Sequence, residues 1–457
     1  MTRLSKLFNF QGELFSSTFT YAASALIRLG SSLVLTRLLN PEAYGVVAIL
    51  SSVAFVLELI SDVGTVALLV RHPRGGEPRF IHTLWTVRFL RNVMNFALLY
   101  AFAPRIAELY ETPFLAEPLR DYSYTFLLAG LQSMSFLLAQ RDQKSRILNY
   151  AELATNAAMT VSVVLLAWAL RDYYAFVYGA LIQRALMSLA SLLYYREVGV
   201  SFAWDREAVR DQFQFAKVVL PSSLLTIALS QYDRVVLLKL FDLSLLGLYG
   251  LAAGIIAPVS GLISKNSRVV LYARCADYVR VDRSSAGRRY YAENIKLMRL
   301  GVLLPALVAG FAPAIVGTLY DSRYAGASPI LMLLALATVL GGFENPAENL
   351  LVAAGRTHVV LMSNVIRVLV LPISTLLGYH FFGFTGFLVG TLVPPLAVTA
   401  YCFYEQRKLN LLAPRLEQKR FLEAVAAFAA ALAISQLWLY LVPAGDFVGT
   451  VKRNLTG

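Results

Sequence analysis

Five arginines lie inside long apolar stretches, where a fixed positive charge needs a particular reason. A charged side chain at membrane depth is costly and usually faces the interior of a helix bundle or a water-filled cavity. A guanidinium group pairs bidentately with phosphate oxygens, so arginines that line such a cavity could hold a pyrophosphate group. The arginines with this placement are Arg28, Arg88, Arg91, Arg234 and Arg367.

Acidic side chains accompany some of these arginines. Glu58 and Asp62 are one helical turn apart in a single apolar stretch, and Asp233 directly precedes Arg234. Residues three, four or seven apart share one face of a helix. Glu58 and Asp62 could therefore neutralise an arginine or carry a coupling proton or cation, and the sequence leaves both roles open.

A purely structural explanation competes for three of the arginines. Arg88 and Arg91 lie near the predicted cytoplasmic end of their helix, from which their side chains could snorkel to the membrane surface. Arg234 lies near the other end of its helix and could simply pair with Asp233. Arg28 and Arg367 lie deeper, so a place on a cavity wall is the stronger interpretation for them.

The composition requires a membrane protein. Apolar residues make up 58% of the 457 positions, and the mean hydropathy is +0.61. The apolar stretches repeatedly reach about 20 residues, the length of helix that crosses ~30 Å of hydrocarbon. We predict an all-α integral membrane protein with twelve core transmembrane helices, at 15–36, 43–70, 81–103, 121–139, 150–170, 174–195, 213–238, 246–272, 297–319, 328–352, 358–380 and 384–404. A further apolar run at 421–442 predicts an additional C-terminal helix, and whether it spans the membrane is left open.

Polar segments divide this pattern into parts and set its orientation. The predicted parts are a lead-in at 1–14, a six-helix lobe at 15–195, a linker at 196–212, a second six-helix lobe at 213–404, and a C-terminal segment at 405–457. Every second loop is basic, namely 71–79, 140–146, 274–296 and 405–420. Because basic loops remain on the cytoplasmic side, this alternation predicts a cytoplasmic N-terminus.

Several functional classes are disfavoured. The net charge of +13 follows from the basic loops, so it indicates membrane topology rather than nucleic-acid binding. Cys275, Cys402 and the four histidines show no metal-ligand spacing, and the chain has no glycine-rich phosphate loop with a trailing lysine. A membrane glycosyltransferase or polymerase would ordinarily need larger extramembrane loops than these. We therefore predict no enzyme, no catalytic residues, no metal site and no bound cofactor.

The two halves share a sequence repeat. Arg37-Leu38-Leu39-Asn40 is followed by Gly45, and about 200 residues later Lys239-Leu240-Phe241-Asp242 is followed by Gly247. Two similar halves, each opening with a charged membrane helix, are typical of transporters built from repeats around a polar cavity. The arginines predict that this cavity is positively charged.

Motifs along most of the chain carry a resemblance to a known family. They are Leu35-Thr36-Arg37-Leu38-Leu39-Asn40-Pro41-Glu42-Ala43-Tyr44-Gly45, Ser61-Asp62-Val63-Gly64, Gln140-Arg141-Asp142, Tyr232-Asp233-Arg234, Leu246-Gly247-Leu248-Tyr249 and Ala353-Ala354-Gly355-Arg356. In this order the motifs resemble the polysaccharide flippases of the multidrug/oligosaccharidyl-lipid/polysaccharide exporter superfamily.

The resemblance implies a fold and a function. It implies a V-shaped pair of six-helix lobes in the bacterial inner membrane that open alternately to the two sides. The expected substrate is an oligosaccharide repeat unit linked to undecaprenyl pyrophosphate, moved to the periplasmic leaflet for exopolysaccharide or O-antigen and lipopolysaccharide assembly. The resemblance also implies that Arg28, Arg234, Arg88 and Arg367 meet the anionic head group. Polysaccharide polymerases and membrane lipids are the expected partners, and no nucleic acid is expected.

Two relatives within the superfamily remain alternatives. One is a lipid II flippase, and the other is a multidrug or other ion-coupled antiporter. A drug antiporter would favour a more acidic cavity than the one these arginines predict. Transport could be coupled to a proton or sodium gradient in the predicted flippase and in both alternatives.

Overall fold

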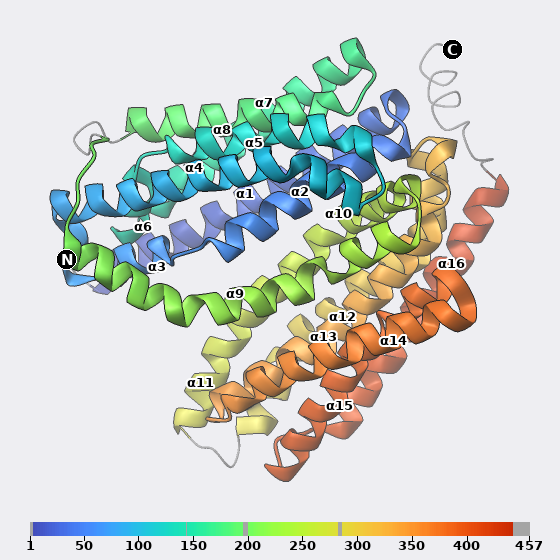
Figure 1. Cartoon of the computed structure of the whole chain (residues 1–457). Helices are drawn as coiled ribbons and strands as arrows, with labels where there is room; N and C mark the ends of the chain where they lie inside the picture. The colour runs from blue at the N-terminus through green and yellow to red at the C-terminus, as the bar shows by residue number, and fades with distance from the viewer. Residues whose placement is uncertain (1–2, 143, 195–199, 282–285, 442–457) are drawn as a thin grey trace, which may run out of the picture. The chain divides into compact units, whose positions relative to one another are not determined.

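The computed structural model describes residues 3–142, 144–194, 200–281 and 286–441, and within these ranges it is helical and contains no β-strand (Figure 1). The chain forms two compact units, residues 1–247 and 248–457, which we describe separately. Parts of three predicted segments lie outside the described residues: 196–199 of the linker, 282–285 of the third basic loop, and the tail 442–457. The membrane fold class predicted from the sequence is confirmed.

Unit 1 is built from nine α-helices and the first residues of a tenth among the described residues. They are α1 (Arg3–Leu38), α2 (Pro41–Ile60), α3 (Thr65–Arg71), α4 (Pro78–Leu109), α5 (Ala116–Gly130), α6 (Ser135–Arg141), α7 (Ser145–Leu170), α8 (Tyr174–Tyr194), α9 (Arg206–Leu240) and the start of α10 (Leu243–Asn266). Helix α4 packs on α5, α7 packs on α8 and α1, and α9 packs on α2.

Unit 2 contains the rest of α10 and the helices that follow it. A π-helical segment, η3 (Ser267–Leu271), leads into α11 (Tyr272–Val281). The remaining helices are α12 (Ala286–Leu319), α13 (Ala327–Ala353), α14 (His358–Gly390), α15 (Val393–Lys408) and α16 (Pro414–Leu441). Helix α12 lies between α13 and α16 and packs on both (Figure 1).

The observed helices refine the predicted spans. Nine helices in the described ranges are long and apolar enough to cross a membrane. The predicted helix 43–70 is broken between α2 and α3, the predicted helix 121–139 is broken between α5 and α6, and the predicted lead-in 1–14 is helical from Arg3 as part of α1. The count of twelve spans and the division at 196–212 remain predictions; the division of the chain into two compact units falls after residue 247.

Helix α16, the additional C-terminal helix, is an integral part of unit 2. The side chain of Arg420 is fully buried, pairs with Glu417 at 2.6 Å, and donates to the carbonyl oxygens of Met298 and Gly342 at 3.0 and 2.8 Å. A buried guanidinium is tolerated only when charge and hydrogen bonds are both satisfied. These bonds tie α16 to α12 and α13.

The repeated glycines of the sequence lie where two helix starts meet in unit 1. A Cβ atom on Gly45 would lie 2.1 Å from the carbonyl oxygen of Leu243, and one on Gly247 would lie 1.8 Å from that of Pro41. Backbone atoms cannot move aside as side-chain tips can. The repeat is therefore explained by mutual close packing of α2 and α10, for which only glycine is small enough.

We predict that Gly45→Ala destabilises the protein because its methyl group collides with the backbone at Leu243. Overpacking of this kind costs about 1–3 kcal/mol, and thermal unfolding of the purified protein in detergent would measure it. The matched control is Gly30→Ala in α1, where a Cβ atom meets nothing within 4 Å. Equal unfolding temperatures for the two variants would contradict the packing explanation.

An ionic cluster on the predicted cytoplasmic side of unit 1 joins the loop 71–79 to the linker. Arg74 pairs with Asp205 at 2.6 Å, with Glu77 at 2.9 Å and with Glu207 at 2.9 Å. The backbone amides of Ala203 and Asp205 donate to the hydroxyls of Thr86 and Thr83 in α4. Hydrogen bonds from Arg74 and from the Glu207 amide hold the pKa of Asp205 below its ordinary value.

The lowered pKa of Asp205 predicts how acid loosens this linker. A carboxyl group with a depressed pKa stabilises the folded state above its unfolded pKa of about 3.9, and this contribution is lost as the pH falls through the lower folded-state value. Hydrogen exchange at residues 203 and 205 measures the docking. At pH 7 we expect several-fold faster exchange in Asp205→Asn than in the wild type, with the two converging below about pH 4.

Glu108→Gln, which removes an exposed carboxylate from the far end of α4, is the control and should exchange like the wild type. If Asp205→Asn exchanged its amide hydrogens at the wild-type rate at pH 7, the Arg74 cluster would not be what holds the linker.

Candidate functional site

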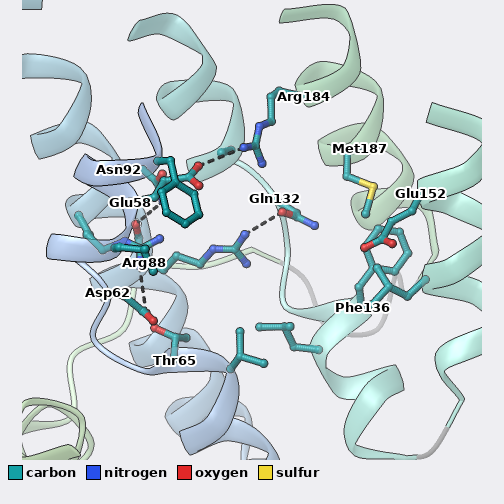
Figure 2. Close-up of a pocket in the computed structure, with 17 residues that line it drawn as sticks. Glu58, Asp62, Thr65, Arg88, Asn92, Gln132, Phe136, Glu152, Arg184 and Met187 are labelled. Carbon is teal, nitrogen blue, oxygen red and sulfur yellow. Dashed lines mark hydrogen bonds and ion pairs between the residues drawn. The ribbon is translucent and has the colours of Figure 1, made fainter. Parts of the chain in front are cut away.

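A cavity of about 420 Å³ lies within unit 1. Its wall is formed by helices α2, α3, α4, α5, α6, α7 and α8 and by the two helix breaks. Figure 2 shows the charged and polar side chains that face it. The charged lining residues are Glu58, Asp62, Arg88, Arg91, Glu152 and Arg184.

The break between α2 and α3 places Asp62 at the cavity. Gly64 has φ +67°, a left-handed conformation that favours glycine, and its amide donates to Asp62 Oδ1 at 3.0 Å. The Ser61 hydroxyl accepts a hydrogen bond from the buried Asn95 of α4 at 2.9 Å. The motif Ser61-Asp62-Val63-Gly64 therefore ends one helix, turns the chain and presents a carboxylate.

The break between α5 and α6 places Gln132 opposite. Backbone groups freed by a helix break inside a membrane need replacement partners. The Ser133 amide donates to the Ser191 hydroxyl at 2.9 Å, and the Ser133 and Ser135 hydroxyls donate to the Ser191 carbonyl. Serines of α8 and of the break thus hold this second irregular segment in place.

Arg141 connects α3 and α6, two of the helices that line the cavity. Its guanidinium group donates to the carbonyl oxygens of Leu69 and His72 at 2.6 and 2.8 Å, where α3 ends. A cation at a helix C-terminus also complements the helix dipole. The arginine of the motif Gln140-Arg141-Asp142 therefore anchors α3 to α6 and does not face the cavity.

Three arginines line the cavity and have different partners, and Figure 2 labels two of them, Arg88 and Arg184. Arg91 pairs with Asp62 at 3.4 Å, and Arg184 pairs with Glu58 at 3.0 Å. Arg88 donates to the side-chain oxygen of Gln132 at 2.7 Å. Within the described part of the chain, Arg88 has no carboxylate within ion-pairing distance.

Glu152 is the third carboxylate of the cavity and lies apart from the arginines. It extends from α7 beside Phe136 and Met187 (Figure 2). It is exposed and has no polar partner among the described residues. Three arginines therefore face three carboxylates in this cavity of unit 1. The positively charged central cavity expected from both halves stays a prediction.

This arrangement suits a ligand that has both anionic and hydroxyl groups. Arg88 offers a guanidinium group whose charge is not neutralised, and the ion pairs of Arg91 and Arg184 are partly exposed, so an incoming anion can compete for them. Carboxylate and amide groups such as Glu152, Gln132 and Asn92 can bond hydroxyl groups of a sugar. Within the described residues, no group of three or more acidic, histidine or cysteine side chains could hold a metal ion.

The structure brings four of the eight predicted site residues together. Arg88, Arg91, Glu58 and Asp62 line one cavity. Arg28 is exposed on α1 and does not line this cavity. In α9, the side chain of Arg234 lies 3.4 Å from the Ser52 hydroxyl, its backbone amide donates to Asp233 at 2.9 Å, and neither residue lines this cavity. Arg367 lies in unit 2 and pairs with two glutamates.

Arg184 and Gln132 are cavity residues that the sequence interpretation missed. Arg184 occupies the middle of the apolar stretch 174–195, so the criterion that selected Arg28 applies to it equally. Gln132 lies in a helix break that apolar periodicity does not reveal.

Comparisons with known proteins agree with this fold and these motifs. Residues 34–329 match the family described as polysaccharide biosynthesis protein. The teichuronic acid biosynthesis protein TuaB of Bacillus subtilis (strain 168) is 24% identical over 303 residues, which cover 65% of this chain and 62% of TuaB. The succinoglycan biosynthesis transport protein ExoT of Rhizobium meliloti (strain 1021) is 25% identical over 311 residues, which cover 66% of this chain and 61% of ExoT. The chain thus matches about three-fifths of the length of these curated relatives.

Solved structures share the fold at low sequence identity. The lipid II flippase MurJ, in an inward closed conformation, matches with a TM-score of 0.70 and 14% identity, over 96% of this chain and 95% of MurJ. An inward-facing multidrug resistance MATE family transporter of the MOP superfamily matches with a TM-score of 0.59 and 14% identity, over 88% and 96%. Because the family match covers more than half of its length, the chain belongs to the polysaccharide biosynthesis protein family, and its fold is that of the MurJ and MATE transporters.

Proposed function

We propose that this protein is a flippase for oligosaccharide repeat units linked to undecaprenyl pyrophosphate. It moves them from the cytoplasmic to the periplasmic leaflet of the bacterial inner membrane by alternating access, with its N-terminus in the cytoplasm. The product feeds exopolysaccharide or O-antigen and lipopolysaccharide assembly, where a polysaccharide polymerase is the expected partner. The observation that carries the proposal is Arg88, a guanidinium group held in a membrane cavity without a carboxylate partner among the described residues.

The depth of the cavity supports loading from the cytoplasmic leaflet. Arg88 lies ten residues after the start of α4 at Pro78, which corresponds to about 15 Å at 1.5 Å per residue. Under the predicted topology, the ends of α3, α6 and α8 and the starts of α4 and α7 are cytoplasmic, and all five helices line the cavity. This topology supports a site that a lipid head group enters from the cytoplasmic side, no deeper than about the middle of the ~30 Å hydrocarbon core.

The chemistry of the cavity supports a pyrophosphate next to a sugar. A pyrophosphate group presents several oxygens, and guanidinium groups bind such oxygens in a bidentate manner. Arg88 is available first, and Arg91 and Arg184 can exchange their partly exposed carboxylate partners for phosphate oxygens. The released carboxylates Glu58 and Asp62, together with Glu152, then accept hydrogen bonds from sugar hydroxyls.

The same cavity bears on the alternatives. A lipid II flippase would use the arginines in the same way, since lipid II also combines a pyrophosphate with a saccharide. A multidrug antiporter would instead use Glu58, Asp62 and Glu152 to bind a cation, exchanging it for a proton or sodium ion. Arg28 and Arg234 remain proposed contacts for the head group outside this cavity.

We predict that Arg88→Gln impairs transport more than it impairs folding. A charge-assisted hydrogen bond contributes about 1.5–3 kcal/mol, so losing the charge should lower transport efficiency roughly 10- to 100-fold. The assay uses proteoliposomes that contain purified protein and a short-chain polyprenyl-pyrophosphate oligosaccharide, and it follows the appearance of the saccharide on the far leaflet. The control is Arg79→Gln, an exposed arginine in the first turn of the same helix, which should transport like the wild type.

Three results would overturn the proposal in different ways. Wild-type transport by Arg88→Gln, with transport lost in Arg28→Gln, would move the head-group site away from this cavity. Movement of lipid II but not of polyprenyl-pyrophosphate oligosaccharides would identify a lipid II flippase. Uptake of a cationic dye under an ion gradient, with no movement of either lipid, would identify the antiporter.

A further inference from the structure

Unit 2 contains a second charged cluster at membrane depth. Arg367 of α14 bonds directly to Glu344 of α13, and its guanidinium group lies 3.6 Å from Glu348, one turn further along α13. The other edge of the guanidinium group donates to the Asn364 side chain at 2.6 Å. One cation is thus shared between two carboxylates.

These three side chains are largely closed off from their surroundings. The side chains of Glu344 and Glu348 are 8% and 15% exposed, and that of Arg367 is 24% exposed. The fully buried hydroxyl of Ser363 in α14 lies beside the Cys402 thiol of α15, and this thiol in turn faces both glutamates. Side chains of both neighbouring helices therefore enclose the cluster.

The groups around the cluster do not neutralise the net negative charge of two glutamates and one arginine. The groups that face the two glutamates from packed helices are Arg367 of α14 and the thiol of Cys402 of α15. Elsewhere in unit 2, Arg420 pairs with Glu417, Arg299 with Glu423, and Lys408 with Glu405, so these charges are already compensated. With both glutamates ionised, the cluster would keep one uncompensated negative charge.

An uncompensated buried charge is a large cost. Leaving one member of a buried ion pair without a partner strongly destabilises a protein. A carboxylate can avoid this cost by binding a proton, which neutralises it without changing its shape. The second oxygen of a neutral carboxyl group also remains free to accept a hydrogen bond.

We propose that Glu344, Arg367 and Glu348 form a proton-binding site in which the two carboxylates share one ionic charge and one proton. Glu348 carries the proton, because Arg367 is bonded to Glu344 and lies further from Glu348. A proton is the ligand rather than a metal ion, because a metal would face the adjacent guanidinium charge. In addition, no set of three metal-ligating acidic, histidine or cysteine side chains occurs among the described residues.

The helix that carries both glutamates contains a proline between them. Pro346 lacks an amide proton, so the carbonyl oxygen of Gly342 loses its helical partner, and Arg420 donates to that oxygen at 2.8 Å. The carbonyl oxygen of Pro346 itself accepts from the Tyr290 hydroxyl at 3.0 Å. Binding or release of the proton by Glu348 therefore changes the charge two residues beyond Pro346, where side chains replace helical hydrogen-bond partners.

The role of this proton in transport rests on the proposed function, whereas the site itself does not. Under that proposal, a proton that binds Glu348 from one side of the membrane and leaves to the other would couple transport to a proton gradient. The sequence interpretation offered Glu58, Asp62 and Asp233 for coupling. The charge imbalance assigns the proton instead to the Glu344–Arg367–Glu348 site.

The test measures protonation directly in full-length protein in lipid nanodiscs. Infrared difference spectra recorded over a pH titration report the carbonyl band of a protonated carboxyl group. We expect one such band in the wild type that is lost in both Glu348→Gln and Glu344→Gln, because the remaining carboxylate then pairs one-to-one with Arg367. In Arg367→Gln we expect an additional protonated carboxyl group. Glutamine resembles a neutral carboxyl group, so the glutamate variants should fold, and size-exclusion profiles would check this.

Glu423→Gln is the matched control, since Glu423 pairs one-to-one with Arg299 at 2.9 Å and should leave the spectrum unchanged. The proposal is overturned if the band persists in Glu348→Gln and Glu344→Gln, or if sodium ions abolish it in the wild type at constant pH. Proteoliposome transport at several pH values then tests coupling separately. Absence of transport together with the expected spectra would count against the flippase and leave the proton site intact.

Discussion

The cost of an uncompensated charge in a low-dielectric interior determines how this chain uses its arginines. Arg420 is fully buried and is held by Glu417 and two carbonyl oxygens. Arg141 is held by the carbonyl oxygens at the end of α3. Arginines held in this way by a carboxylate or by carbonyl oxygens of the protein itself are structural. Those whose partners are exposed or neutral, such as Arg184 and Arg88, are the ones that remain available to a ligand.

Irregular backbone follows the same principle. Both helix breaks in unit 1 lie at the cavity, where backbone polar groups can be satisfied by side chains or water. Asn95 and Asp62 hold the first break, and the hydroxyls of Ser133, Ser135 and Ser191 hold the second. Each break also contributes a polar side chain to the cavity wall, Asp62 from the first and Gln132 from the second.

The sequence predicted what a single helix determines. The spacing of Arg88 and Arg91 placed these side chains on one face of α4, and both line the cavity. Glu58 and Asp62 also line it, but Asp62 lies in the break after α2, so a shared helix face does not explain its position. Contacts between different helices could not be predicted from the sequence. Arg367 met the criterion for a cavity arginine, but its partners Glu344 and Glu348 come from another helix, and only the fold shows that its charge is already shared.

The glycine repeat is a second feature for which the sequence predicts a relation between two positions but not the contact between them. The sequence identified Gly45 and Gly247 as equivalent positions, and from a repeat alone they could equally have marked two independent turns. The structure shows that each glycine admits the backbone of the other's helix start. The amino-acid sequence alone shows that the two glycine positions are equivalent, whereas the contact between their helices depends on packing.

The exposure of each cluster decides what can compensate its charge. In unit 1, Glu58 and Asp62 are each 37% exposed, so water and a ligand both reach them, and opposite charges can stay apart without a large penalty. In unit 2, Glu344 is 8% exposed, so neither water nor a large ligand can offset the surplus negative charge. The open cluster therefore suits a bulky anion with hydroxyl groups, and the closed cluster suits the smallest cation, a proton. The two clusters combine similar residue types, and solvent access rather than composition separates their chemistry.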